Sequence, residues 1–300
     1  MLFKRFGKKV HYNDRLAFNQ VIGKAIIQNG KHKVSKTDIE TVLTPHSANY
    51  PTVIQDNFKG VFFLDSENEW LDMVVTNIGF IENEYKRYLC LAALFQACLA
   101  KRPFNKFHRA NLDIRTKDVT RTFGNKTTWE TSFGKLFKRY VAEYNSAVFS
   151  NGQRNKVIGG YDALQSPNGV DLVYIDPPYV RSNWSEATDY LYMYHFLEGL
   201  TDYDNWMNRV DVSVKSRRIR DTGSQNRFLK KTDMKSSFFE LMDRFQDNIL
   251  VISYRESGVP SLDEIQEKLL SLNKKITVFR KSHKYVLSDA ENTELLIIGK

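Results

Sequence analysis

DLVYIDPPYV, residues 171–180, is the stretch of sequence that decides the fold. Its apolar run, LVYI, ends in an acid that is followed by two prolines and a tyrosine. A short apolar run bounded by turn residues is typical of a buried strand. The prolines fix their own φ angles and keep the residues before them extended, so the following loop is stiff. The stretch therefore predicts a strand whose carboxyl end presents Asp176 and the ring of Tyr179.

Further apolar runs on both sides of this stretch predict the rest of a sheet. KVHY (9–12) and VIGGYDAL (157–164) contain short strands, and NILVISY (248–254) is a buried one. ITVFRKSHKYVLS (276–288) and ELLIIG (294–299) predict a terminal pair joined by a polar turn. Helical patterns alternate with these strands, which predicts a doubly wound, mostly parallel α/β sheet of the Rossmann-like type with a C-terminal β-hairpin at its edge.

The helical patterns differ in how much of their surface is apolar. Residues 35–43 carry Ser35 and Asp38 at capping-box spacing. YKRYLCLAALFQACLA, ending at Ala100, is apolar nearly all round and should be buried, with Pro103 stopping it. A short strand is expected at 59–64. Other helices are expected at 18–26, 67–100, 129–145, 186–209, 233–247 and 261–272.

The Asp-Pro-Pro-Tyr loop suits one kind of ligand. In open parallel sheets, ligands bind beyond the carboxyl ends of the strands. Here a planar ring that carries an exocyclic amine can stack on Tyr179. Its amine can donate hydrogen bonds to the Asp176 carboxylate and the Pro177 carbonyl, while Pro178 stiffens the loop.

With these residues in view, the chain resembles the amino-group DNA methyltransferases, specifically the D12-like (DPPY) adenine methylases of bacteria and phages. The resemblance covers nearly the whole length and includes KRPFNKFHRANL (101–112), RTFGNKTTW (121–129) and YMYHFLEGL (192–200). DPPY looks like the fourth family motif. VHYND looks like the second, which implies that Asp14 holds the ribose of S-adenosylmethionine. GGYDAL looks like the third, which implies that Asp162 meets the cofactor adenine.

The resemblance implies an N6-adenine methyltransferase that uses S-adenosylmethionine and no metal, on double-stranded DNA, in a restriction-modification or phage system. It implies a catalytic core formed by residues 1–30 and 151–300, and a largely helical target-recognition insertion at 31–150. The family's FxGxG segment, whose glycines approach the methionine part of the cofactor, normally precedes the second motif, and no segment here fits it. We therefore expect the first strand to be absent, which leaves a truncated frame, a decayed remnant, or a split enzyme whose companion chain supplies that segment.

Charge is concentrated in two stretches of this +9 chain. Residues 101–139 hold eleven Lys/Arg against three acids, and residues 207–235 hold nine against three. Basic clusters interleaved with aromatics and amides favour a nucleic-acid partner, although solvated surface faces remain open as an alternative. We expect phosphate or base contacts from six residues in the first stretch: Arg102, Lys106, Arg109, Arg115, Arg121 and Lys126.

Other features narrow the class of protein. The two cysteines, Cys90 and Cys98, lie in an apolar run and predict buried thiols in a cytoplasmic protein. The longest apolar run has about 12 residues, short of the roughly 18 that a membrane span needs. His108 and His195 lack metal-ligand spacing. Two alternative functions stay open: an RNA adenine methyltransferase, which shares DPPY, and a non-catalytic DNA-binding remnant or subunit.

Overall fold

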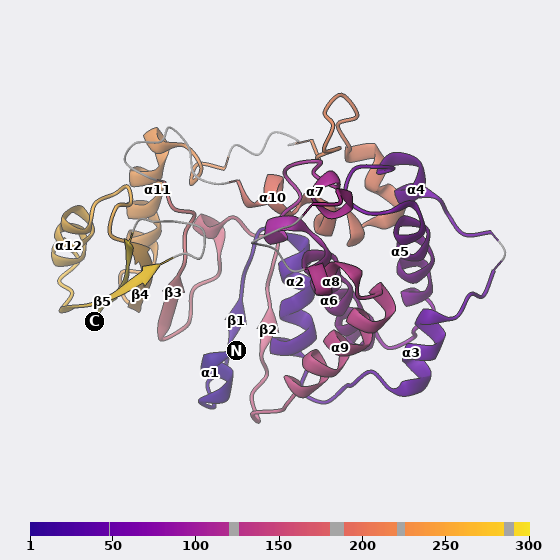
Figure 1. Ribbon diagram of the computed structural model, residues 1–300. Coiled ribbons are helices and arrows are strands. Elements are labelled where there is room, and N and C mark those ends of the chain that lie inside the picture. Colours follow the sequence, from indigo (N-terminus) through magenta and orange to yellow (C-terminus); the bar gives the residue numbers. More distant parts are fainter. Residues whose placement is uncertain (48, 120–125, 181–188, 221–225, 285–290) are drawn as a thin grey trace. The chain divides into compact units, whose positions relative to one another are not determined.

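The computed structural model describes six stretches of the chain, namely residues 1–47, 49–119, 126–180, 189–220, 226–284 and 291–300 (Figure 1). Two compact units are distinguished by their internal contacts. Unit 1 comprises residues 1–161 and 190–221, and unit 2 comprises residues 162–189 and 222–300. The inserted region expected at 31–150 lies within unit 1, and its boundaries as an insertion stay a prediction. No described helix is long and apolar enough to cross a membrane.

Unit 1 contains a short parallel strand pair, β1 (His11–Tyr12) and β2 (Lys156–Val157). Most of the unit is helical, and in Figure 1 its helices α2, α6 and α9 pack together. The bounds are α1 (Leu2–Arg5), α2 (Ala17–Gly23), the π-helical η1 (Lys24–Gln28), α3 (Lys36–Leu43), α4 (Val53–Asn57), α5 (Asp65–Ile78), α6 (Glu84–Lys101), the 3-10 turn η2 (Pro103–Asn105), α7 (Asp113–Thr116), α8 (Lys126–Glu130), α9 (Phe133–Ser146), α10 (Tyr190–Leu200) and η4 (Tyr203–Arg209).

Local sequence signals account for several of these boundaries. The capping box at α3 is confirmed: the Ser35 hydroxyl accepts a hydrogen bond from the backbone N–H of Asp38, and the Asp38 side chain accepts from that of Ser35. Helix α6 is buried along most of its length, as its apolar surface predicts, and it ends immediately before Arg102 and Pro103. Both cysteines are free and buried in this helix. The long helical pattern at 67–100 divides into α5 and α6.

The prediction of a strand at 59–64 is wrong, because the aromatic residues of this segment pack into the core of unit 1. Phe62 and Phe63 are fully buried, and residues 60–62 form a turn. Phe58, Phe62, Phe63, Phe107 and Phe196 form one cluster of rings with centroid distances between 5.0 and 6.5 Å. Such close aromatic packing from separate segments outweighs the strand preference of these residues.

Unit 2 holds a four-stranded sheet in the order β3 (Leu172–Ile175), β4 (Ile249–Arg255), β6 (Glu291–Gly299), β5 (Ile276–Lys284). β3 and β4 are parallel, and β6 is antiparallel to both β4 and β5. Its helices are η3 (Ala163–Gln165), α11 (Lys231–Arg244) and α12 (Leu262–Ser271). The strand ending at Ile175 and the C-terminal hairpin are thereby confirmed. Together with the parallel pair of unit 1, they confirm the Rossmann-like α/β class.

His195 in α10 is a buried titratable group of the unit 1 core. It is fully buried, its Nε2 donates to the Phe107 carbonyl at 3.1 Å, and its ring packs beside Phe62. Its Nδ1 has no hydrogen-bond partner among the described residues. Burial, with the nearby charges of Arg102 and Arg218, lowers the pKa of His195 to about 4. The neutral imidazole is therefore the form that the fold holds.

This burial predicts an acid-sensitive core. The pKa of His195 is lower in the folded chain than the 6.5 expected after unfolding, so stability is full above pH 6.5 and is lost as pH falls towards 4. Replacing His195 by Gln, which keeps a donor but does not titrate, should remove about 2 kcal/mol of the stability difference between pH 7 and pH 5. Urea denaturation of both proteins at the two pH values measures this, and equal pH dependence would contradict it.

Candidate functional site

The Asp-Pro-Pro-Tyr loop follows directly from the end of β3 in unit 2. Asp176 is exposed, whereas Pro177 and Val180 are buried. The Val180 carbonyl accepts a hydrogen bond from the backbone N–H of Val259 at 3.0 Å, so the far end of the loop is fixed to the segment after β4. The loop is thus held at both ends and presents its carboxylate to solvent.

Tyr179 is tied to the same carboxylate. Its hydroxyl donates to Asp176 Oδ1 at 2.8 Å and lies 3.2 Å from the hydroxyl of Ser253 in β4. Its ring meets Tyr254 edge-on at 5.8 Å, and the Tyr254 hydroxyl is bonded to the Pro260 carbonyl. Burial, together with the neighbouring Asp176 charge, raises the pKa of Tyr179, so the phenol stays a donor. Sequence reasoning missed Ser253; a lone hydroxyl inside the apolar run ILVISY was the available signal.

Asp14 lies just beyond β1 in unit 1, in a turn built around its carboxylate. Oδ1 accepts from the backbone N–H of Leu16 at 2.8 Å, and Oδ2 accepts from the Tyr12 hydroxyl and the Asn19 amide at 3.1 Å each. The Gln20 amide donates to the Asp14 carbonyl at 3.0 Å. These donors fix the direction of a half-buried acid at the carboxyl end of a parallel strand.

Two residues that sequence reasoning missed support this turn. The buried carboxylate of Glu198 in α10 accepts hydrogen bonds from the backbone N–H groups of Ala17 and Phe18, the first residues of α2. Burial raises the pKa of Glu198, although those two donors oppose the rise. A side chain at Gly159 would place its Cβ 2.3 Å from the Gln20 side chain, so glycine makes room for the contact to Asp14.

The third predicted acid, Asp162, is exposed at the start of unit 2. Its side chain accepts from the backbone N–H of Leu164 at 2.9 Å and caps the short η3 turn. Asp14 therefore belongs to one unit, while Asp162 and the Asp176–Tyr179 loop belong to the other.

Two of the six predicted DNA contacts have structural partners instead. Arg102 is 1% exposed, and its guanidinium donates to the backbone carbonyls of Phe62, Lys106 and Arg109. Arg115 forms a bidentate pair with Glu67 at 2.8 and 2.9 Å, and its side chain is 4% exposed. Basic residues in a charged stretch can thus be interior supports.

The other predicted contacts differ in accessibility. Arg109 and Lys126 are exposed, Lys106 is half-buried, and Arg121 lies outside the described residues. Lys126 lies 3.7 Å from Glu130 in an exposed pair, which holds it only weakly. These residues keep side chains that a polyanion can reach.

The tyrosines of α10 are involved in packing within unit 1. Tyr192 donates to the His108 carbonyl at 3.0 Å, and the Tyr194 ring lies 5.6 Å from Phe18.

Within the described part of the chain, no group of three or more His, Cys, Asp or Glu side chains is placed to hold a metal ion.

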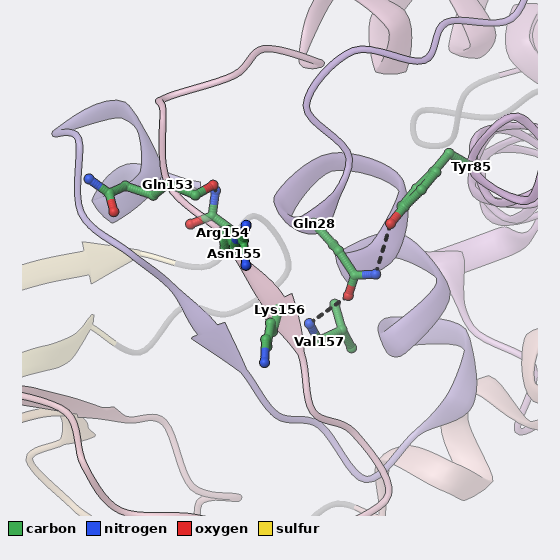
Figure 2. A pocket seen from close by; sticks show the side chains of 7 residues that line it. All are labelled: Gln28, Tyr85, Gln153, Arg154, Asn155, Lys156 and Val157. Atoms are coloured by element: carbon green, nitrogen blue, oxygen red, sulfur yellow. Dashed lines mark hydrogen bonds between the residues drawn. The ribbon is translucent and has the colours of Figure 1, made fainter.

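A polar hollow of about 470 Å³ lies elsewhere in unit 1, beside the residues that lead into β2 (Figure 2). Figure 2 shows Gln28 pointing between Tyr85 and the backbone of Val157, and its amide bonds both. Arg154 and Lys156 also line it. Because it flanks the beginning of β2, it is separate from the strand end where parallel sheets bind ligands.

Comparison with known proteins gives one informative likeness. The chain is 27% identical over 311 aligned residues to the type II methyltransferase M2.HphI of Haemophilus parahaemolyticus, covering 98% of this chain and 85% of that protein. No family model matches the chain, and no solved structure matches it. A likeness over nearly the whole length supports a methyltransferase.

The contacts of Glu198 predict its contribution to stability. Replacing Glu198 by Ala should lower the free energy of unfolding by about 1–2 kcal/mol, because two N–H groups at the start of α2 lose their acceptor. The free energy of unfolding of Glu198→Gln should fall between those of the unaltered chain and Glu198→Ala, since one acceptor oxygen remains. Urea denaturation and amide exchange at Ala17 and Phe18 measure both effects. The control Glu143→Ala removes an exposed pair with Arg139 and should cost less than about 0.5 kcal/mol; an equal loss from both would argue against this role of Glu198.

Proposed function

We propose that this chain belongs to an S-adenosylmethionine-dependent DNA methyltransferase that methylates the N6 amine of adenine. The observation that carries the proposal is the loop at the end of β3, which presents the exposed Asp176 carboxylate beside the anchored Tyr179. The likeness to a type II methyltransferase over 98% of this chain supports the same reaction class. The resemblance to D12-like adenine methylases supports adenine as the target base. It also supports a cytoplasmic restriction-modification or phage system as the setting.

The loop has room for an amine. Tyr179 occupies Asp176 Oδ1, and among the described residues Oδ2 accepts no hydrogen bond. An adenine turned out of the duplex can donate its N6 hydrogens to this carboxylate and to the Pro177 carbonyl. These bonds favour a tetrahedral nitrogen whose lone pair points away from the ring. The gain comes from positioning and electrostatics, as for other preorganised sites.

S-adenosylmethionine, when bound, supplies the methyl group as an electrophilic sulfonium. The N6 amine would take up this methyl group and give up one of its two protons to solvent water. Asp176 accepts the amine hydrogen bonds throughout, while Tyr179 stays protonated and holds the carboxylate in place.

The Asp14 turn fits the ribose of the cofactor. A carboxylate at the carboxyl end of a parallel strand accepts ribose hydroxyls in dinucleotide-binding folds. Leu16, Tyr12 and Asn19 already donate to the two Asp14 oxygens, so a ribose hydroxyl would share this carboxylate with them or displace one of them. Asp162 is exposed and is proposed to meet the cofactor adenine.

The methionine part of the cofactor needs a further segment. The sequence holds no FxGxG stretch. In the described sheets, β1 pairs with β2 alone and β3 lies at the end of its four-stranded order, so each can accept another strand along one edge. We propose that a glycine-rich segment, from a companion chain or another part of the protein, completes the cofactor site. Without that glycine-rich segment, the chain would be a DNA-binding subunit that does not transfer methyl groups.

Duplex DNA is the proposed substrate. Arg109, Lys106 and Lys126 are proposed to contact it, together with Arg121. Arg102 and Arg115 act from inside the fold, because their guanidinium groups are bound to other residues. RNA remains the alternative substrate, since the chemistry at Asp176 is the same for an adenine in either polymer.

The first test replaces Asp176 by Ala. Transfer of a labelled methyl group to unmethylated duplex DNA should fall about 100-fold or more, because the amine loses its acceptor, while DNA affinity should change less than threefold. The label should be recovered as N6-methyladenine. Asp171→Ala, at the opposite end of the same strand, is the control and should retain transfer. Equal loss of transfer and DNA binding in Asp176→Ala would sink the proposed role, and preferential labelling of RNA would make RNA the substrate.

The second test concerns the cofactor site. Calorimetric titration of these 300 residues with S-adenosylmethionine should give binding at least tenfold weaker than in the presence of a chain that carries the FxGxG segment. Asp14→Ala should abolish the gain, because the ribose contact is lost. Tight binding by the 300 residues alone would show that no further segment is needed.

A further inference from the structure

The second basic stretch of the chain contains a hairpin that the proposed catalytic residues do not involve. Val210 and Ile219 form an isolated antiparallel bridge, with Asp211 N–H bonded to the Arg218 carbonyl at 2.8 Å and Arg220 N–H to the Arg209 carbonyl at 2.7 Å. The orange loop at the top of Figure 1 is this hairpin. It belongs to unit 1 and follows η4 directly.

The base of the hairpin is anchored, and its tip is open. Val210 is fully buried and Ile219 is 4% exposed, both within the core of unit 1. At the tip, Val212 is 58% exposed, and Lys215 is also exposed. Ser213 donates its hydroxyl and its backbone N–H to Asp211, which orders the tip. A fixed base under an ordered, solvated tip is suited to presenting side chains to a large partner.

The tip faces the turn after α4 across a groove of about 420 Å³. Lys59 lines one side, and Lys215 and Arg217 line the other. Asp56 is the acid of this groove, and the Thr52 hydroxyl already donates to it at 2.6 Å. Within the described residues, Lys215 and Arg217 form no ion pair, and Lys59 reaches Asp65 only at 3.8 Å, with both side chains largely exposed. Three cations thus converge on one groove with little internal neutralisation.

The remaining cations of the hairpin have different positions. Arg218 lies 5.5 Å over the ring of Tyr192 and Arg220 donates to the Val210 carbonyl, so both brace the base. Arg209 lies 3.9 Å from Asp202. They add positive potential behind the groove without lining it.

We propose that this groove binds backbone phosphates of duplex DNA, on a surface additional to the Lys106–Lys126 stretch. The inference rests on the proposed function. An open groove lined by loops and cationic side chains suits an extended polyanion, whereas small-molecule pockets are enclosed and mostly apolar. Because phosphate contacts carry no sequence information, the groove positions the duplex and does not read its bases.

The test is the salt dependence of DNA affinity. Fluorescence anisotropy with a 25-base-pair duplex should give a slope of log affinity against log salt that is about 2–3 smaller in the triple variant Lys59→Ala, Lys215→Ala, Arg217→Ala than in the unaltered chain, since each phosphate contact contributes about 0.9. The control Lys31→Ala, Lys33→Ala, Lys36→Ala removes the same charge from exposed positions of unit 1 and should change the slope by less than about 1. Circular dichroism and urea denaturation check that both variants are folded.

Each outcome bears on the groove separately from the methyl transfer. An unchanged slope in the groove variant, or an equal change in the control, overturns the proposal. So does an unaltered chain that does not bind duplex DNA, or a groove variant that loses affinity for single-stranded RNA alone. Absence of methyl transfer even with a chain that carries the FxGxG segment, together with a reduced slope in the groove variant, would instead retain the DNA groove and overturn the proposed enzymatic function.

Discussion

The interior position of Arg102 is the constraint on which much of unit 1 depends. Its guanidinium is buried between the end of α6, the turn at Phe62 and the segment from Lys106 to Asn111, and it bonds a carbonyl or amide oxygen in each of the latter two. The rings of Phe62 and Phe107 cover it at 4.6 and 5.5 Å. Burial lowers the pKa of Arg102, yet a guanidinium stays charged at neutral pH. A buried charge is costly without partners, so the surrounding backbone must keep the conformation that points its oxygens inward.

The position of Arg102 also shows where sequence reasoning succeeds and where it stops. Local rules predicted the capping box at Ser35, the end of α6 before Pro103, β3 and the terminal hairpin, because each depends on residues close in the chain. The prediction of a strand at 59–64 was wrong because its aromatic rings pack against residues more than 40 positions away in the sequence. For the same reason, the amino-acid type of Arg102 or Arg115 could not reveal that its charge faces inward.

The candidate site divides along similar lines. Asp14, Asp162 and Asp176 were identified from short motifs, and the structure gives each a defined local environment. The supports of these acids come from distant segments: Glu198 reaches the start of α2 from α10, and Ser253 reaches Tyr179 from β4. A single sequence does not indicate which residues far apart in the chain come into contact in the fold. A motif can therefore propose which residues carry the chemistry, whereas the groups that hold those residues in place are found only from coordinates.

The chain crosses between the two units three times, near residues 161, 189 and 221. A cut at the first crossing would leave α10 on the carboxyl-terminal fragment, although Phe196 and Leu197 belong to the core of the amino-terminal one. The amino-terminal fragment would lack part of the unit 1 core, whereas the carboxyl-terminal fragment would keep the whole core of unit 2. Reassembly of unit 1 would therefore depend on α10 packing back against the amino-terminal fragment. Anyone who wishes to express unit 1 by itself must instead join residue 161 to residue 190 with a new linker and end the gene near residue 221.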